Sequence, residues 1–250
     1  MIHILILGYN EEKALPGMLA RLDETLRQQH EPFRFVVVDD GSVDATASVV
    51  QALAGKLPVL LLRHETNRGV AKAFDTGLRR IAGEARPEDF IITMEGDGTN
   101  DPGSLLPMLR RLAEGYDVVC ASRYCPGGAY VGFPLFRRFL SLSANLLTRL
   151  VLAIPGVEDY TIFFRGYRAG VVQRALRAFG DDFIESRSFA SNAELLIKAW
   201  RSGDLRCCEV ATIYRYDLKH GKSKMKVCSN AAEYFRMFRR TLGRRAQAPR

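Results

Sequence analysis

Apolar residues alternate between two spacings along the first half of the chain. Short runs rich in β-branched residues suit buried strands, and they occupy residues 2–7, 35–38, 59–62, 90–94 and 118–121. Segments with apolar residues at helical spacing separate these runs, at residues 13–29, 44–54, 70–82 and 102–114. Asp44 and Asp101 stand at two of the helix starts and are predicted to be N-caps. The alternation predicts an α/β fold with a doubly wound, mostly parallel sheet flanked by helices.

The second half of the chain follows a different pattern. It contains a glycine-rich loop at residues 127–132, an amphipathic helix at 134–154, a helix near 190–201, a strand near 206–213 and a basic tail. No linker rich in proline, glycine or serine separates the two halves. We therefore predict a single domain over residues 1–226, followed by a basic C-terminal helix and tail over residues 227–250.

Acidic residues follow three of the predicted strands. Because ligands of open α/β sheets bind beyond the carboxyl ends of the strands, these residues mark the expected site. Glu95 and Asp97 stand two residues apart, so both carboxylates can turn toward one hard cation such as Mg²⁺ or Mn²⁺. Asp39 and Asp40 follow another strand and suit contact with a nucleotide base or ribose. The alternative for both pairs is that they cap helices and stay solvated.

Basic residues follow other strands at the same predicted edge. Asn67-Arg68-Gly69 precedes a helix that continues through Lys72, and it offers backbone donors and positive charge to a phosphate. Arg123 follows the fifth strand and can bind a phosphate bidentately. The loop Gly221-Lys222-Ser223-Lys224 has the composition of a clamp for a diphosphate. A turn, a surface arginine and a solvated charge run are the simpler interpretations of these three features.

The helical segment at residues 134–154 carries an apolar stripe that Arg137, Arg138 and Arg149 interrupt. Three arginines argue against a bilayer-spanning helix but suit a helix at a membrane surface, where the cations lie near lipid phosphates. A helix packed against the protein core is the alternative. The tail at residues 235–250 mixes apolar residues with arginines and suggests contact with a membrane surface or a nucleic acid.

Charge and composition narrow the classes of function. The 250 residues carry 36 Lys and Arg against 28 Asp and Glu, but the net charge is −5 over residues 1–120 and +13 over 121–250. Such asymmetry indicates two half-sites with different ligands. Five cysteines without C-x-x-C spacing and four histidines without metal-ligand spacing argue against disulfides and zinc, and favour a reduced, cytoplasmic setting. The chain lacks an 18-residue apolar run, a Walker A loop, a G-x-G-x-x-G fingerprint and a G-x-S-x-G elbow at a strand end.

Eight short motifs follow one another over residues 4–226. They are Tyr9-Asn10-Glu11, Val38-Asp39-Asp40-Gly41-Ser42-Val43-Asp44, Asn67-Arg68-Gly69, Glu95-Gly96-Asp97, Ser122-Arg123-Tyr124, Asp159-x-Thr161-x-x-Phe164-Arg165, Asn192-x-Glu194 and Gly221-x-Ser223-Lys224. Each motif is weak alone. In this order they resemble the inverting glycosyltransferases of family 2, which have the GT-A fold, and within them the dolichyl- and polyprenyl-phosphate mannosyltransferase-like branch.

The resemblance implies divalent-metal-dependent transfer of a sugar from a nucleoside-diphosphate sugar, GDP-mannose or a UDP-sugar, to a polyprenyl or dolichyl phosphate with inversion. Residues 1–120 would bind the donor and residues 121–226 the acceptor, with Glu95 and Asp97 holding Mg²⁺ or Mn²⁺. The implied catalytic residues are Asp97, Arg123 and Glu194. The implied donor site comprises Leu7, Tyr9, Asn10, Glu11, Asp39, Asp40, Ser42, Arg68, Gly69, Lys72, Gly96, Ser223 and Lys224. The implied acceptor-phosphate ligands are Arg123, Arg137, Arg138 and Arg165.

The implied partners are the donor, the lipid acceptor and the cytoplasmic face of a membrane, bound peripherally. No nucleic-acid partner is expected, and the oligomeric state stays open. This chain departs from the family pattern: Glu95 replaces an Asp, Ile162 and Phe163 replace small residues, and Leu218 replaces a common arginine, for which Lys219 or Arg215 is the substitute. The transmembrane tail of many relatives has no counterpart.

Three other interpretations of the sequence stay open. A family 2 transferase with a soluble or saccharide acceptor would need a carboxylate, such as Asp159 or Glu194, as a general base. A basic nucleic-acid-binding protein would use the C-terminal patch, although no recognised binding motif accompanies it. An inactive scaffold would be consistent with the replacement at Glu95.

Overall fold

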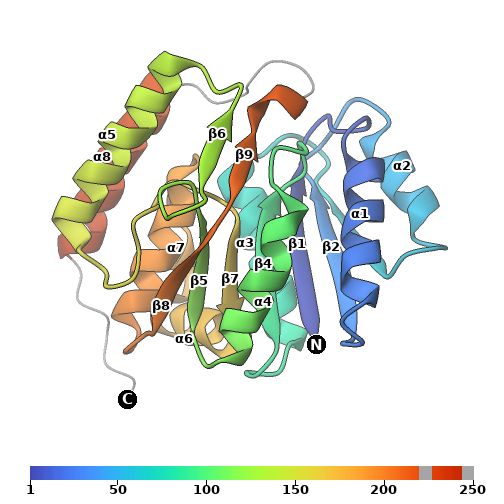
Figure 1. The fold of residues 1–250 in the computed structure, drawn as a ribbon, viewed down its shortest axis with the longest axis horizontal. Helices are drawn as coiled ribbons and strands as arrows, with labels where there is room; N and C mark the ends of the chain where they lie inside the picture. Colours follow the sequence, from blue (N-terminus) through green and yellow to red (C-terminus); the bar gives the residue numbers. More distant parts are fainter. Residues whose placement is uncertain (220–226, 244–250) are drawn as a thin grey trace.

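The computed structural model describes residues 1–219 and 227–243, which form a seven-stranded sheet between layers of helices, together with a two-stranded ribbon (Figure 1). The sheet has the order β3-β2-β1-β4-β7-β5-β8. Its strands are β1 Ile2–Gly8, β2 Phe33–Asp39, β3 Val59–Arg63, β4 Phe90–Glu95, β5 Val118–Ser122, β7 Arg165–Arg168 and β8 Cys207–Ala211. Only β7 is antiparallel to its neighbours β4 and β5 among these described strands. The mostly parallel, doubly wound sheet that the sequence predicts is confirmed.

Helices occur in every segment where the apolar spacing predicts one, and one further helix, Ala169–Phe179, occurs where none is predicted. They are α1 Leu15–Arg27, α2 Thr46–Leu53, α3 Val70–Glu84, α4 Leu105–Ala113, α5 Leu135–Leu152, α6 Ala169–Phe179, α7 Ala190–Arg201 and α8 Val227–Gly243. The predicted cap at Asp101 is confirmed: its Oδ1 accepts from Gly103 N at 2.9 Å, at the start of the 3-10 turn Pro102–Ser104 that leads into α4. The predicted cap at Asp44 is wrong by one position, because the N-cap of α2 is Ala45, although Asp44 Oδ1 accepts from Thr46 N at 3.0 Å. Both carboxylates satisfy a backbone donor at the start of a helical turn.

The core lies on both faces of the sheet because successive strand residues point to opposite sides. On one face Leu5 packs with residues of α3, α6 and α7, and on the other Ile4 packs with residues of α1 and α4. Burial of each such side chain stabilises the fold by about 1.5–3 kcal/mol. The two layers leave the carboxyl ends of the parallel strands uncovered by helices, which is where the polar motifs lie.

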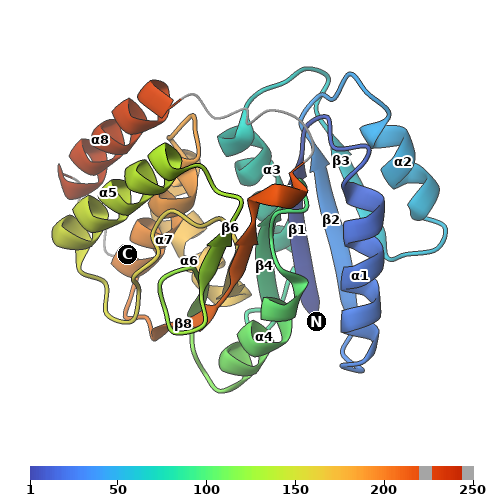
Figure 2. The same cartoon turned by 45° about the horizontal axis from the view of Figure 1, so that its top comes forward.

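A short parallel ribbon stands at this end of the sheet. It pairs β6 Ala129–Val131 with β9 Ile213–Arg215, and Arg215 N donates to Thr99 O at 2.9 Å. The sequence predicts one strand near residues 206–213, but the structure divides it at Thr212 into β8 and β9. Figure 2 shows the ribbon between α5 and the ends of β1 and β4, so it brings the second half of the chain onto the strand ends.

Helix α5 lies along one edge of the molecule beside α8 (Figures 1 and 2). Only Asn145 and Thr148 of α5 are buried, whereas Leu135 is 81% exposed and Leu150 is 74% exposed. The alternative of a helix packed into the core is therefore wrong for most of α5. Leu152, at its end, packs with a small cluster of α7 and α8 residues. In the parts of the chain that the structure describes, no helix has both the length and the apolar character needed to cross a bilayer.

Candidate active site

The loops after β1 and β2 are tied to each other by side-chain to backbone hydrogen bonds. Asn10 N donates to Ser42 Oγ at 2.8 Å, and Ser42 N donates to Asp39 Oδ1 at 3.0 Å. Glu11 N donates to Thr46 Oγ1 at 2.8 Å. The motif residues Asn10, Glu11, Asp39 and Ser42 therefore form one rigid corner, as a nucleotide site at the switch between strands requires.

Asp40 has a different role from the contact with a base or ribose that the sequence predicts. Its two carboxylate oxygens accept from Arg68 N at 3.0 Å and from Gly69 N at 2.8 Å, and His64 Nδ1 lies 2.7 Å from Oδ1. Both oxygens of the Asp40 carboxylate therefore have hydrogen-bond partners within the protein. Asp40 instead positions the Arg68-Gly69 turn, and Gly69 can begin α3 there because its φ of 89° favours glycine.

The other predicted donor residues lie near this corner in different environments. Leu7 is buried in β1, and Tyr9 is half-buried after it. Gly96 N donates to Leu7 O at 2.8 Å, and a Cβ at Gly96 would lie only 2.9 Å from that oxygen, so glycine permits the close approach of the two strand ends. Lys72 is exposed in the first turn of α3 and pairs with Asp75 at 2.8 Å. Ser223 and Lys224 lie outside the described residues.

The predicted metal ligands Glu95 and Asp97 lie together at the end of β4. Asp97 Oδ1 accepts from Thr99 Oγ1 at 2.6 Å, and Asp97 Oδ2 forms an ion pair with Lys219 Nζ. Burial raises the pKa of Glu95, and the neighbouring charge of Asp97 raises it further, while Lys219 and Arg123 offset part of this shift. A carboxylate pair of this kind gains from a cation between its members.

Lys219 supplies a positive charge beside the two acidic residues. Burial by itself lowers the pKa of the Lys219 ammonium, but the charges of Asp97 and Glu95 outweigh it and raise that pKa. The ammonium therefore stays charged. Within residues 1–219 and 227–243, no group of three or more His, Cys, Asp or Glu side chains could hold a metal ion.

Arg123 is held rigidly by a buried carboxylate. Its Nε and Nη2 donate to the two oxygens of Asp159, each at 2.7 Å, and Nη2 also donates to Thr161 Oγ1 at 2.6 Å. Burial alone would raise the pKa of Asp159, but the charge and hydrogen bonds of Arg123 hold it below its ordinary value. The Arg123 guanidinium also lies 4.9 Å from the ring centre of Tyr130 and 5.7 Å from that of Tyr214.

Two further arginines reach the same group of rings, which we call the aromatic cluster and which comprises Tyr124, Tyr130, Phe133, Tyr214 and Tyr216. Arg138 lies 5.6 Å from the ring centre of Tyr130, and Arg137 lies 5.9 Å from that of Tyr216. The structure therefore brings Arg123, Arg137 and Arg138 together around one cluster. Arg123 already donates to Asp159 and Thr161, so Arg137 and Arg138 are the arginines of this group that can offer their donors to an anion while they stack on the rings.

The aromatic cluster is a part of the site that the motif analysis missed. Tyr214 connects it to the carboxylates, because the charges of Glu95 and Asp97 add to burial in raising the Tyr214 pKa well above its ordinary value. Tyr130 lies on β6 and Tyr214 on β9, and Phe133 and Tyr216 follow these two strands along the chain. Their spacing along the chain is the only sequence signal, and it does not reveal that β6 pairs with β9.

Arg165 is not at the predicted acceptor site. It is fully buried, and its guanidinium donates to Asn192 O at 2.8 Å and to Tyr160 O at 2.7 Å. These backbone acceptors lie inside the fold, so Arg165 joins the segment after α5 to α7. Arg165 is predicted to bind the acceptor phosphate, and the structure instead gives it a structural role.

Glu194 is also placed inside the fold, in the first half of α7. It is fully buried, it accepts from Ser186 N at 2.8 Å, and it pairs with Lys198 Nζ at 2.7 Å. Both of its oxygens accept from Glu185 N at 3.2 Å. Glu194 is predicted to be catalytic, and the structure instead shows it holding the segment before α7 in place.

Replacing Glu194 with glutamine should lower the free energy of unfolding by about 1–3 kcal/mol, because a buried hydrogen bond to a charged group is weakened. Turnover per folded molecule should stay within about twofold of wild type, since no reacting group is lost. Chemical denaturation and an activity assay normalised to folded protein measure the two quantities. A large loss of turnover with unchanged stability would restore the catalytic assignment.

Comparisons with known proteins agree with this arrangement. The model of the family described as "Glycosyl transferase family 2" matches residues 3–176. The chain is similar to the undecaprenyl-phosphate mannosyltransferase of Micrococcus luteus, with 32% identity over 88% of this chain and 86% of that protein. It is also similar to the polyprenol monophosphomannose synthase of Mycolicibacterium smegmatis, with 31% identity over 80% of this chain and 72% of that protein.

The fold is similar to that of solved structures with low sequence identity. Glucosyl-3-phosphoglycerate synthase from Mycobacterium tuberculosis, in complex with Mn²⁺, UDP and phosphoglyceric acid, has a TM-score of 0.66 at 16% identity. The alignment covers all of this chain and 80% of that one. TarS residues 1–349 from S. aureus, in complex with UDP-GlcNAc, has a TM-score of 0.60 at 20% identity over 96% of this chain and 65% of that one. The GT-A fold is thereby confirmed.

Proposed function

Because this chain belongs to glycosyl transferase family 2, we propose that it transfers a sugar from a nucleoside-diphosphate sugar, GDP-mannose or a UDP-sugar, to a polyprenyl phosphate with inversion. The observation that carries the proposal is the position of Arg123, Arg137 and Arg138 around the aromatic cluster, beside the Glu95 and Asp97 carboxylates. One site for an anionic acceptor thus adjoins one site for a metal-bound donor. The names of the relatives support the lipid acceptor.

The donor would lie on the corner formed by the ends of β1, β2 and β4. Asp39 and Glu11 suit the nucleoside, and the Arg68-Gly69 turn that Asp40 positions suits a phosphate. Glu95 and Asp97 would hold Mg²⁺ or Mn²⁺, since two carboxylates on one strand end offer the hard oxygen ligands that these ions prefer. When bound, the ion would neutralise charge on the diphosphate leaving group.

The acceptor phosphate would contact Arg137 and Arg138, with Arg123 oriented by Asp159 beside them. Its oxygen would attack the anomeric carbon of the donor in a single displacement, and the nucleoside diphosphate would leave with the electron pair. A phosphate monoester with a second pKa near about 6 is mostly dianionic at neutral pH, so it needs no protein base.

The alternative of a soluble or saccharide acceptor is less well supported. A hydroxyl acceptor requires a general base, and the carboxylates that the sequence suggests for that role include Asp159 and Glu194. Asp159 is fully buried in its bidentate pair with Arg123, and Glu194 is fully buried in its pair with Lys198. Neither has an oxygen directed to an acceptor hydroxyl beside Asp97.

The direct test is product analysis. Purified protein is incubated with labelled GDP- and UDP-sugars, Mn²⁺ and a polyprenyl phosphate, and the label is followed into organic solvent. We expect an extractable glycolipid that releases the sugar on mild acid treatment. Label appearing only in water-soluble products, with saccharide acceptors present, would support the alternative acceptor and contradict the lipid acceptor.

The exposed face of α5 is the surface on which we propose that the enzyme meets the membrane, as a peripheral protein on the cytoplasmic side. Its exposed apolar residues are Leu135, Phe136, Phe139, Leu142, Leu146, Leu147, Leu150 and Val151. Arg137 and Arg138 lie on the same helix, where lipid phosphates would meet them. A continuous apolar face of this kind on a monomer marks an interaction surface.

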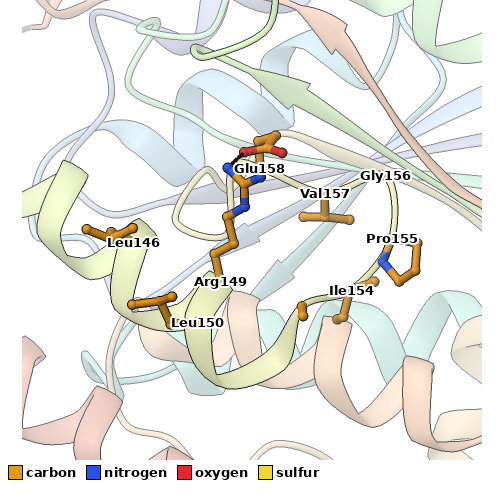
Figure 3. Close-up of a pocket in the computed structure, with 9 residues that line it drawn as sticks. Leu146, Arg149, Leu150, Ile154, Pro155, Gly156, Val157 and Glu158 are labelled. Atoms are coloured by element: carbon orange, nitrogen blue, oxygen red, sulfur yellow. Dashed lines mark hydrogen bonds and ion pairs between the residues drawn. The ribbon is translucent and has the colours of Figure 1, made fainter.

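A pocket of about 630 Å³ continues this face beyond the end of α5 (Figure 3). Leu146 and Leu150 of α5 line one side, and residues 153–158 line the other, with Ile154, Pro155 and Val157 supplying apolar surface. Arg149 and Glu158 form an ion pair beside it. The pocket lies far along α5 from Arg137 and Arg138, so it suits part of a hydrocarbon chain better than the reacting phosphate.

Replacing Phe136 and Phe139 together with serine should weaken binding to vesicles at least about tenfold, because each phenylalanine that enters the bilayer contributes about 1.5–3 kcal/mol. Co-sedimentation with anionic phospholipid vesicles measures this binding. Both side chains are two-thirds exposed, at 68% and 66%, so the fold should be retained. Val43→Ser is the matched control, since Val43 is 86% exposed but lies away from α5. Equal vesicle binding by all three proteins would contradict the membrane-surface assignment.

A further inference from the structure

Lys219 occupies the acidic site, which its position in the sequence does not reveal. Its ammonium pairs with Asp97 Oδ2, although 122 positions separate the two residues. The Lys219 side chain is only 14% exposed and that of Asp97 only 6%, so the pair is largely removed from water. The charges of Glu95 and Glu11 also favour the ammonium. The Lys219 ammonium therefore interacts with the same carboxylates that would hold a divalent ion.

We propose that Lys219 is the resident counter-ion of the metal site and a positioning residue for the donor diphosphate. In the free enzyme its ammonium holds Asp97. When the donor brings a divalent cation to Asp97, the ammonium moves from that carboxylate to the diphosphate. This inference rests on the proposed function and adds to it a specific coupling between metal binding and donor binding.

The number of metal ligands at the site supports this movement of the Lys219 ammonium from Asp97 to the diphosphate. Mg²⁺ and Mn²⁺ prefer about six oxygen ligands, and proteins usually bind Mg²⁺ with one or two carboxylates plus substrate phosphates. Here Asp97 Oδ1 already accepts from Thr99, and Asp97 Oδ2 holds Lys219. A metal ion arriving alone would have to displace the ammonium and leave it buried without a partner, which is costly.

A diphosphate would supply both the missing metal ligands and a new partner for the displaced ammonium. Its oxygens add ligands for the metal ion, and its negative charge gives the displaced ammonium a new partner. Metal and nucleoside diphosphate should therefore bind with strong positive coupling, and the coupling should depend on the charge at position 219.

The experiment measures Mn²⁺ binding by the loss of the free-ion electron paramagnetic resonance signal, with and without GDP or UDP. In wild type, the nucleoside diphosphate should strengthen Mn²⁺ binding by about 30-fold or more. In Lys219→Met, Mn²⁺ alone should bind about tenfold more tightly, because no ammonium competes, and the strengthening by nucleoside diphosphate should fall by about tenfold from its wild-type value. The part of the strengthening that comes from diphosphate oxygens as metal ligands should remain. A purely structural ion pair would not move these two quantities in opposite directions.

Two control variants accompany the measurement. Lys219→Arg keeps the charge and should retain most of the coupling, whereas Lys56→Met removes an exposed lysine remote from the site and should match wild type. If wild type binds neither Mn²⁺ nor nucleoside diphosphate, the proposed function fails with the inference. If both ligands bind wild type and Lys219→Met shows the same coupling, the inference alone is overturned. Circular dichroism of each variant verifies that it is folded.

Discussion

Replacement of Asp97 with asparagine should lower sugar transfer at least about a thousandfold, because it removes the charge that would hold the divalent cation at the leaving group. Asparagine has nearly the same shape and can still accept from Thr99, so the loop after β4 should keep its conformation. Mn²⁺-dependent binding of the nucleoside-diphosphate sugar should be lost as well. Initial rates of glycolipid formation and calorimetric titration with the donor measure the two effects.

The matched control for this prediction is Asp23→Asn, which also removes one carboxylate. Asp23 pairs on the surface of α1 with Arg27 at 2.7 Å, and exposed pairs of this kind contribute about 0–1 kcal/mol. Its transfer rate and donor binding should equal those of wild type. Mn²⁺-dependent donor binding that survives in Asp97→Asn would show that Asp97 is not a metal ligand.

Replacement of Asp159 with alanine should lower the free energy of unfolding by about 3–5 kcal/mol, which is the usual cost of removing one partner of a buried ion pair. Asp159 is fully buried, and its loss would leave the Arg123 guanidinium without its two shortest carboxylate contacts. Denaturant-induced unfolding followed by tryptophan fluorescence and circular dichroism measures the change. If the alanine variant does not fold, Asp159→Asn provides the same measurement with a smaller cavity.

The control for Asp159 is Asp217→Ala. Asp217 makes a similar fork with Arg215, at 2.9 and 2.7 Å, but on the exposed surface of the ribbon. Its removal should change stability by no more than about 1 kcal/mol. Equal effects of the two substitutions would show that burial does not distinguish the pairs.

The Asp159 effect should also depend on pH in a defined direction. The pKa of Asp159 in the folded protein is held below its ordinary value, so its carboxylate stabilises the fold above the unfolded-state pKa of about 3.9. This contribution is lost as the pH falls through the folded-state pKa. The stability difference between wild type and Asp159→Ala should therefore be constant near neutral pH and narrow below about pH 4.

Much of the fold follows from short-range patterns in the sequence. Apolar runs such as residues 35–38 and 90–94 become strands inside the sheet, and the segment predicted as a helix at residues 134–154 contains α5. Both follow from the sequence because alternation and helical spacing depend on neighbours along the chain. The carboxylates Asp39 and Asp97 were placed at the carboxyl ends of the strands by the same reasoning. That edge of the sheet holds the candidate site in the structure.

The chemistry of individual side chains was less predictable. Arg165 and Glu194 belong to motifs of the family, yet both are fully buried and hydrogen-bonded inside the fold. Asp40 supports the Arg68-Gly69 turn from within. Motif membership indicates that a residue matters, but a carboxylate that binds a ligand and one that anchors a loop look the same in sequence.

The sequence by itself determined the alternation of strands and helices, the edge of the sheet at which the ligands are expected, and the apolar stripe of α5, since each depends on spacing between near neighbours. Only the tertiary structure decided which charges meet. It pairs Lys219 with Asp97 and Arg123 with Asp159. It also places the arginines of α5 beside rings of the aromatic cluster. These partners are remote along the chain, and their distances are fixed by strand order and by the pairing of β6 with β9.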